Sequence, residues 1–290
     1  MTCNLCPRNC GAERTPDRPG GVCGQPAAPV VARAMLHQWE EPCLVGERGA
    51  GAVFFSGCNL RCVYCQNKPI SQGSVGKPVS AARLREIFQE LVAQGAACLD
   101  LVTPTHFLPA VLEALGEEPW PVPVVWNCGG YEKPEALRLL DGKVQIYLPD
   151  LKYALPGPAA RFSGAEDYFD RAAPAIWEMF RQTGPYRLED GQLQSGVLIR
   201  HLLLPGELEN TRRVLDWVAR TFRPGDVLFS LMSQYTPQPG AAGNLRRHVT
   251  KAEYRAAMAY MENCGITNGY TQERTSAKEE YTPDFDLSGL

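Results

Sequence analysis

The chain has 290 residues, of which 44% are hydrophobic and 21% are charged, and its formal net charge is -3. This composition is that of a globular protein, and it excludes a disordered chain, a collagen-like repeat and a coiled coil. The near-neutral balance gives no support for electrostatic binding of nucleic acid, and no apolar run approaches the roughly 18 residues that a membrane span needs. The N-terminus lacks the charged-then-apolar order of a signal peptide, so we expect a cytoplasmic protein with reduced thiols.

The N-terminal segment up to Cys23 is rich in cysteine, arginine, proline and glycine and has almost no apolar periodicity. Such a segment cannot bury a core, and a bound metal would be needed to order it. Four of the eleven cysteines lie here, at Cys3, Cys6, Cys10 and Cys23. A four-thiolate set suits structural zinc, a single iron or an auxiliary iron–sulfur cluster, and the spacing does not choose among them. Mobile thiols in a frayed terminus are the alternative.

From Gly51 onward, short apolar runs rich in β-branched residues alternate with longer amphipathic stretches. The apolar runs predict strands at Ala52–Ser56, Cys98–Thr103, Val122–Asn127, Val144–Asp150, Gly196–Leu204 and Asp226–Met232. The amphipathic stretches predict helices at Ala81–Ala93, Leu108–Leu115, Pro134–Leu140, Asp167–Gln182, Thr211–Phe222 and Lys251–Asn263. We expect Pro174 to kink or split the fourth helix. Thr250 and Glu253 predict a capping box at the start of the last helix, and Gly265 stops it.

Six strands that alternate with helices predict an α/β fold with a parallel sheet and right-handed crossovers. We expect a cysteine-rich N-terminal extension with a metal site over residues 1–50, the α/β unit over 51–250, and a C-terminal helix and tail over 251–290. Parallel α/β folds and barrels carry their chemistry at the carboxyl ends of the strands. Polar residues collect there, namely Cys58, Thr103, Thr105, His106, Asn127, Asp150 and Lys152, with Arg200 and His201 partway along the fifth strand.

A second group of cysteines, Cys58, Cys62 and Cys65, forms the motif C-x-x-x-C-x-x-C directly after the first strand. Three thiolates on one loop can hold three irons of a [4Fe-4S] cube, which leaves the fourth iron open to bind a small molecule. Zinc competes with this interpretation, although structural zinc usually takes four protein ligands. Three buried structural cysteines are the remaining alternative.

The segment Phe54–Asn67, which contains this motif, resembles the cluster loop of the radical S-adenosylmethionine (SAM) superfamily and, more narrowly, that of the pyruvate formate-lyase-activating-enzyme family. Further likeness is carried by His37–Cys43, Leu101–His106, Asp150–Tyr153, Arg200–Gly206 and Ser230–Tyr235. The whole chain is similar to a pyruvate formate-lyase-activating-enzyme-like branch that has an N-terminal cysteine motif. The resemblance implies that residues 51–250 form a partial (β/α)6 TIM-like barrel.

The resemblance also implies a cofactor chemistry. SAM would chelate the open iron through its amino and carboxylate groups, and one electron from the reduced cluster would cleave it to methionine and a 5′-deoxyadenosyl radical. That radical abstracts a hydrogen atom from the substrate, under anaerobic conditions and with an electron donor such as flavodoxin or ferredoxin. The residues expected to contact the cofactors are Tyr64, Asn67, Thr103, Thr105, Asn127, Asp150, Lys152 and His201.

One departure from the superfamily concerns the end of the second strand. Many members have Gly-Gly-Glu there, whereas this chain has Asp100–Thr105. We therefore expect Thr103, Thr105 or the nearby backbone to receive the SAM amino group. Lys152 is expected to face the SAM carboxylate, with Asp150 holding the lysine or binding a cation. His106 and His201 either contact SAM or substrate, or they are ordinary structural histidines.

The leading hypothesis is a radical SAM enzyme that acts on an unknown substrate, either a small molecule or, for an activase, a glycyl radical enzyme. His37, Glu40, Glu41 and Cys43 lie ahead of the first strand and form either a substrate-facing wall or a solvated edge element. The first fifty residues and the tail after Gly265 could close the barrel, which favours a confined substrate. A non-catalytic, zinc-stabilised α/β binding module is the outside alternative.

Overall fold

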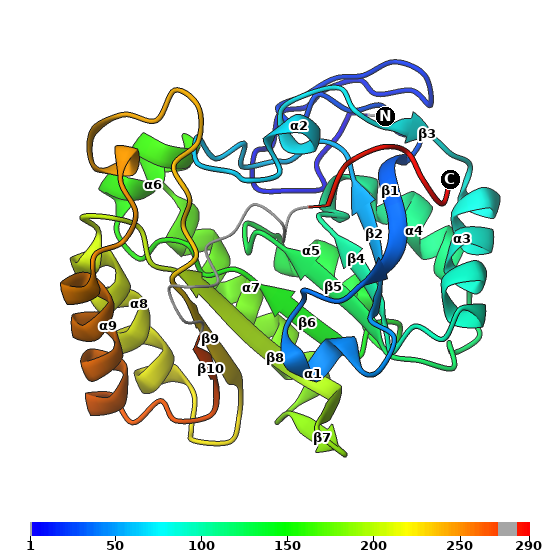
Figure 1. Ribbon diagram of the computed structural model, residues 1–290. Coiled ribbons are helices and arrows are strands. Elements are labelled where there is room, and N and C mark those ends of the chain that lie inside the picture. The colour runs from blue at the N-terminus through cyan, green and yellow to red at the C-terminus, as the bar shows by residue number, and fades with distance from the viewer. Residues whose placement is uncertain (1, 272–282) are drawn as a thin grey trace.

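A computed structural model describes residues 2–271 and 283–290 of the chain (Figure 1). The strands are β1 (Val30–His37), β2 (Ala50–Phe55), β3 (Lys77–Pro78), β4 (Leu99–Val102), β5 (Val124–Cys128), β6 (Ile146–Pro149), β7 (Arg187–Glu189), β8 (Gln192–Leu202), β9 (Leu228–Met232) and β10 (Gly269–Thr271). They form one sheet in the order β10-β9-β8-β6-β5-β4-β2-β1-β3, with β7 paired to β8. The strands from β2 through β4, β5, β6 and β8 to β9 are parallel, as the alternating pattern predicts.

Helices connect these strands and cover the sheet. The α-helices are α1 (Pro42–Val45), α2 (Lys68–Ser71), α3 (Ala81–Ala93), α4 (Leu108–Leu115), α5 (Pro134–Leu137), α6 (Pro156–Ser163), α7 (Tyr168–Thr183), α8 (Leu208–Thr221) and α9 (Lys251–Asn263). Thr250 and Glu253 form the predicted capping box of α9. Pro174 does not split α7, which continues past it, because the proline lies on the exposed side of the helix where water can bond the freed carbonyl. No helix in the described ranges combines the length and apolarity needed to cross a membrane.

The sheet extends beyond residues 51–250 at both edges. β1 pairs antiparallel with β2, and β10 pairs parallel with β9. The C-terminal segment lies along β1 (Figure 1), where the Ala34 amide donates to the Ser288 carbonyl at 3.1 Å and the Phe285 ring packs edge-on against Phe54. The expected regions at residues 1–50 and 251–290 therefore each contribute a strand or a segment to the central sheet.

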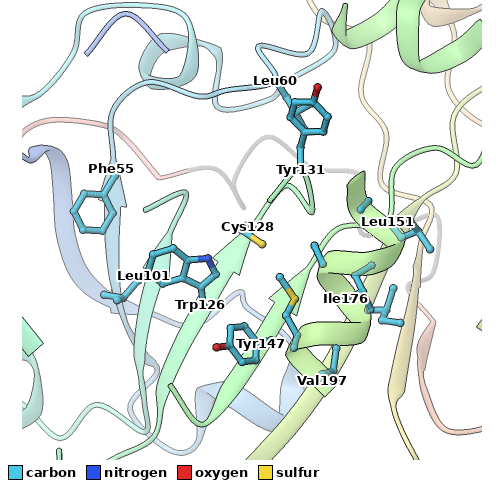
Figure 2. Close-up of a cluster of buried hydrophobic side chains, with 14 of the residues drawn as sticks. Phe55, Leu60, Leu101, Trp126, Cys128, Tyr131, Tyr147, Leu151, Ile176 and Val197 are labelled. Carbon is cyan, nitrogen blue, oxygen red and sulfur yellow. The ribbon is translucent and has the colours of Figure 1, made fainter. Parts of the chain in front are cut away.

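Side chains along the parallel strands alternate between the helices and the barrel interior. Figure 2 shows the helix-facing set, which includes Leu101, Trp126, Tyr147 and Val197 and packs with Ile176 of α7. The interior side chains at the amino-terminal ends of the parallel strands are apolar and pack against Cys43 and Leu44 of α1. They include Ala50, Cys98, Val125, Ile146, Leu148, Leu198 and Leu228. Helix α1 thus closes that end of the barrel, and the polar interior residues lie nearer the carboxyl ends.

Ile176 offers a test of the helix-facing core, since its side chain is fully buried between α7 and the sheet. We expect Ile176→Ala to lower the free energy of unfolding by about 2–5 kcal/mol, because it leaves a cavity, and Ile176→Val to lower it by about 0.5–1.5 kcal/mol. Urea unfolding of the metal-free, reduced protein measures both values. Equal costs for the two substitutions would contradict this packing.

Candidate functional site

A cavity of about 230 Å³ opens at the carboxyl ends of the parallel strands. The thiols of Cys58, Cys62 and Cys65 all line it. Of the eight residues expected to contact the cofactors, six also line it: Tyr64, Asn67, Thr103, Asn127, Asp150 and Lys152. The structure therefore brings the cysteine loop and most of the expected strand-end residues to one place.

The loop that carries the three thiols depends on a glycine. Gly57 has φ +82, and a Cβ at this position would lie 2.3 Å from the Gln25 side chain and 2.8 Å from the Cys23 carbonyl. Only glycine tolerates both the backbone conformation and the close approach. Further along, the Gln72 side-chain amide donates to the Cys62 carbonyl at 2.7 Å. These contacts fix the path of the loop before any metal binds.

The thiols themselves have donors close by. The Leu60 amide lies 3.4 Å from Cys58 Sγ, and the Ser163 hydroxyl donates to Cys62 Sγ at 3.0 Å. Burial raises the pKa of Cys58 to about 12 and also raises that of Cys65. Buried thiols of this kind ionise when a metal compensates the charge, and nearby N–H and O–H donors favour the thiolate. This donor set fits an iron–sulfur cluster, in which three sulfurs bind three different irons.

Tyr64 lies inside the loop and is buried. It accepts a hydrogen bond from the Tyr153 hydroxyl at 2.8 Å, and Tyr153 in turn lies 2.7 Å from the Ser163 hydroxyl. Its ring packs edge-on against Phe162 of α6 and Tyr235. Tyr64 therefore anchors the loop to α6 and at the same time presents part of its surface to the cavity.

Lys152 and Asp150 form a buried ion pair beside the thiols, with 2.6 Å between Nζ and Oδ2. The guanidinium of Arg200 contacts the other oxygen of Asp150, with Nε at 3.2 Å. Burial opposes ionisation of the pair, but the Asp150 carboxylate outweighs it and raises the pKa of Lys152, while Lys152 and Arg200 lower that of Asp150. The site therefore holds a charged ammonium next to the cysteine loop, where an anionic group can bind.

The two threonines after the second predicted strand have separate environments. Thr103 lines the cavity in a left-handed conformation, with φ +60, and its amide donates to the Asn127 carbonyl at 2.8 Å. The Thr105 hydroxyl instead donates to the carboxylate of Glu132, away from the cavity. Glu132 has no signal in the sequence, where it reads as an ordinary loop glutamate. Burial raises its pKa to about 8.

Neither expected histidine lines the cavity. His201 Nδ1 lies 2.6 Å from the Leu151 carbonyl and Nε2 lies 2.9 Å from the Thr211 hydroxyl of α8. His106 Nε2 lies 2.7 Å from the Ser56 carbonyl. Burial lowers the pKa of both rings to about 4, so both are neutral. The alternation along β8 explains His201, because Arg200 faces the interior and its neighbour faces the helices.

The N-terminal segment packs against the cysteine loop. The Arg8 guanidinium donates from Nε to the Asn59 carbonyl at 2.7 Å and to the Ser163 and Gly164 carbonyls. Arg14, which is 9% exposed, lies between two of the N-terminal thiols, with Nη1 at 3.7 Å from both Cys3 Sγ and Cys23 Sγ. Burial raises the pKa of Cys23, and the positive charge of Arg14 opposes that rise.

Among the described residues, no group of three or more His, Cys, Asp and Glu side chains is arranged to hold a metal ion, so neither cysteine group is arranged around a single ion.

Comparisons with known proteins agree with the site. A family model described as a 4Fe-4S single cluster domain matches residues 45–108, the segment that contains the cysteine loop. An uncharacterized protein of Methanocaldococcus jannaschii, MJ0674, is 28% identical over 276 residues, which cover 91% of this chain and 75% of the relative.

Two solved structures of SuiB from Streptococcus suis are similar to this fold, each with a TM-score of 0.50 and 12% identity. One is bound to precursor peptide SuiA and the other to S-adenosylmethionine, and the likeness covers 74% and 79% of this chain respectively. The chain spans about half the length of these structures, 46% and 51%. The likeness confirms the predicted α/β fold class.

Glu132 gives the site a testable pH dependence. Its folded pKa of about 8 lies above the ordinary value of 4.5, so folding retains a proton that the unfolded chain releases, and stability falls between these pH values. We expect wild type to lose up to about 1.4 kcal/mol per pH unit relative to Glu132→Gln between pH 5 and 7.5. Urea unfolding of the metal-free protein measures this, with the exposed Glu135→Gln as control. Parallel profiles for wild type and Glu132→Gln would contradict the assignment.

Proposed function

We propose that this chain is a radical SAM enzyme that binds a [4Fe-4S] cluster through Cys58, Cys62 and Cys65 and binds SAM at the open iron. When bound, cluster and cofactor supply a 5′-deoxyadenosyl radical for hydrogen abstraction from a substrate. The observation that carries the proposal is the convergence of these three thiols on one cavity with the charged Lys152 beside them. The matched 4Fe-4S model over residues 45–108 supports it.

Different residues of the chain would bind different groups of SAM. Lys152, held by Asp150, would receive the SAM carboxylate, and the strained backbone at Thr103 would receive its amino group. Tyr64 would lie beside the bound cofactors, while Leu60, Ile70 and Met232 line the cavity with apolar surface that excludes water. Asn67 and Asn127 would add polar contacts from opposite walls.

The cluster needs an external electron, for which we propose a small donor such as flavodoxin or ferredoxin. Val63, between two of the cluster cysteines, is 50% exposed, so the loop reaches the surface. A short path from the surface to the cluster supports direct electron transfer through this loop.

The subtype and the substrate are proposals as well. The likeness of Phe54–Asn67 to activating enzymes supports an activase that installs a glycyl radical on a partner enzyme. The closed amino-terminal end of the barrel, sealed by Cys43 and Leu44, supports instead a small, confined group as the part that reacts. A peptide side chain inserted into the cavity would satisfy both, and SuiB has been crystallised with a precursor peptide.

We further propose that Cys3, Cys6, Cys10 and Cys23 hold a second metal group. The buried Arg14 guanidinium supports this, because a metal with four thiolates carries net negative charge that a contacting cation stabilises. An auxiliary iron–sulfur cluster and zinc are the two forms to be distinguished.

The first prediction of this function concerns iron and SAM cleavage. Anaerobic reconstitution of wild type should give a brown protein that forms 5′-deoxyadenosine from SAM when reduced with dithionite. Cys58→Ser should lose this activity and about four irons per chain, because an open cluster needs all three thiolates. Cys264→Ser, at the end of α9, serves as the control and should keep both. A colourless zinc protein would support the binding module instead.

The second prediction concerns the N-terminal thiols. We expect the double variant Cys6→Ser, Cys10→Ser to lose one metal group while retaining the SAM-dependent change in the electron paramagnetic resonance spectrum of the remaining cluster. Metal analysis and Mössbauer spectroscopy distinguish a lost cluster from a lost zinc ion. If the metal content per chain equals that of wild type, these thiols hold no metal.

A further inference from the structure

A layer of buried polar side chains lies beneath the cavity, deeper in the barrel than Lys152. Asn127 Nδ2 donates to Glu40 Oε2 at 3.1 Å and to Asp100 Oδ2 at 3.3 Å, so one amide joins two carboxylates. Arg200 donates to Glu40 Oε1 at 2.9 Å and to Asn127 Oδ1 at 2.6 Å. Glu41 follows Glu40 in the chain and is also buried.

The charges in this layer do not balance. Glu40, Glu41, Asp100 and Asp150 supply four carboxylates, whereas Arg200 and Lys152 are the cations in contact with them among the described residues. Both cations contact Asp150. For the other three carboxylates, the cation in contact among the described residues is Arg200, which Asp150 also contacts. Buried charges are normally paired, so this layer has too few cations.

Two carboxylate oxygens in the layer have no hydrogen-bond partner among the described residues. They are Asp100 Oδ1 and Glu41 Oε2, on side chains that are 0% and 4% exposed. Burial raises the pKa of Glu41 to about 7, and burial together with Glu40 raises that of Asp100, so bound protons offset part of the surplus negative charge when no cation is present. Unpartnered buried acceptors are uncommon, and these call for additional N–H donors.

The layer is accessible from the cavity at one point. Glu40, Asn127 and Arg200 line the cavity together with the three cluster thiols, whereas Asp100 and Glu41 lie behind them. Arg200 donates from Nη1 to Glu40 and from Nη2 to Asn127, and its Nε lies 3.2 Å from Asp150 Oδ1, so its positive charge is already shared among groups of this layer. A ligand that adds positive charge at Glu40 would offset the surplus negative charge of this layer.

We propose that the substrate carries an ammonium or guanidinium group that binds at Glu40, above Asp100 and Glu41, and so orients the reacting part toward the cluster end of the cavity. This inference rests on the proposed radical SAM function, since it names the substrate class of the same site. An anionic substrate is disfavoured here, because it would add to the surplus of negative charge.

The test uses two probes of the same shape and different charge, n-butylguanidinium and n-butylurea. Isothermal titration calorimetry of the reconstituted full-length protein without SAM should give at least a roughly tenfold preference for the cation, because its hydrogen bonds to carboxylates are charge-assisted. Glu40→Gln should remove the preference, and the exposed Glu86→Gln on α3 should retain it.

Equal affinity for the two probes, no binding of either, or a preference retained by Glu40→Gln would each overturn the proposal. Thermal unfolding and iron content show whether a variant is folded and carries its cluster. Asp100→Asn is a second variant, which should weaken the binding of n-butylguanidinium and leave that of n-butylurea unchanged. The comparison of the two probes on wild type needs no variant. Failure of the radical SAM function would appear separately, as missing iron or missing SAM cleavage.

Discussion

The parallel pairing of the central strands is the constraint on which the site depends. It places the ends of β2, β4, β5 and β6 at one edge, and it fixes which side chain of each strand faces the interior. A shift of one residue exchanges the two faces. Arg200 and His201 illustrate this, because the first reaches the cavity and the second bonds to Thr211 of α8.

The N-terminal segment belongs to the same assembly as the cysteine loop. Arg8 donates to four carbonyls, two in the cysteine loop and two at the C-terminal end of α6, and Arg14 donates to the His106 carbonyl at 2.6 Å. The His106 ring in turn contacts the Ser56 carbonyl, one residue before Gly57. Hydrogen bonds therefore connect the N-terminal cysteine segment with the cysteine loop.

The sequence predicted the parts of the site that are encoded locally. Strong apolar runs located the six parallel strands, and the spacing of Cys58, Cys62 and Cys65 predicted their shared loop. β1 was missed because it pairs antiparallel, between β2 and the edge strand β3, and lies in a region taken as an extension.

Long-range contacts account for the rest of the differences. The Thr105 hydroxyl donates to Glu132, which is 27 residues away in the chain, and no local pattern encodes that contact. Glu40 belongs in the same category, because its carboxylate is 160 residues from Arg200 and enters the barrel only through the placement of α1. From the sequence, Glu40 was compatible with either a substrate-facing wall or a solvated edge element. The fold is needed to distinguish these two placements.

The apolar closure by α1 has a consequence for turnover. In the part of the chain that is described, Cys43 and Leu44 seal the amino-terminal end, so molecules exchange with solvent at the carboxyl edge. A substrate group seated at Glu40 would lie deeper than a cofactor held at Lys152. This arrangement imposes an order of binding and release, in which the deeper molecule binds first and leaves last.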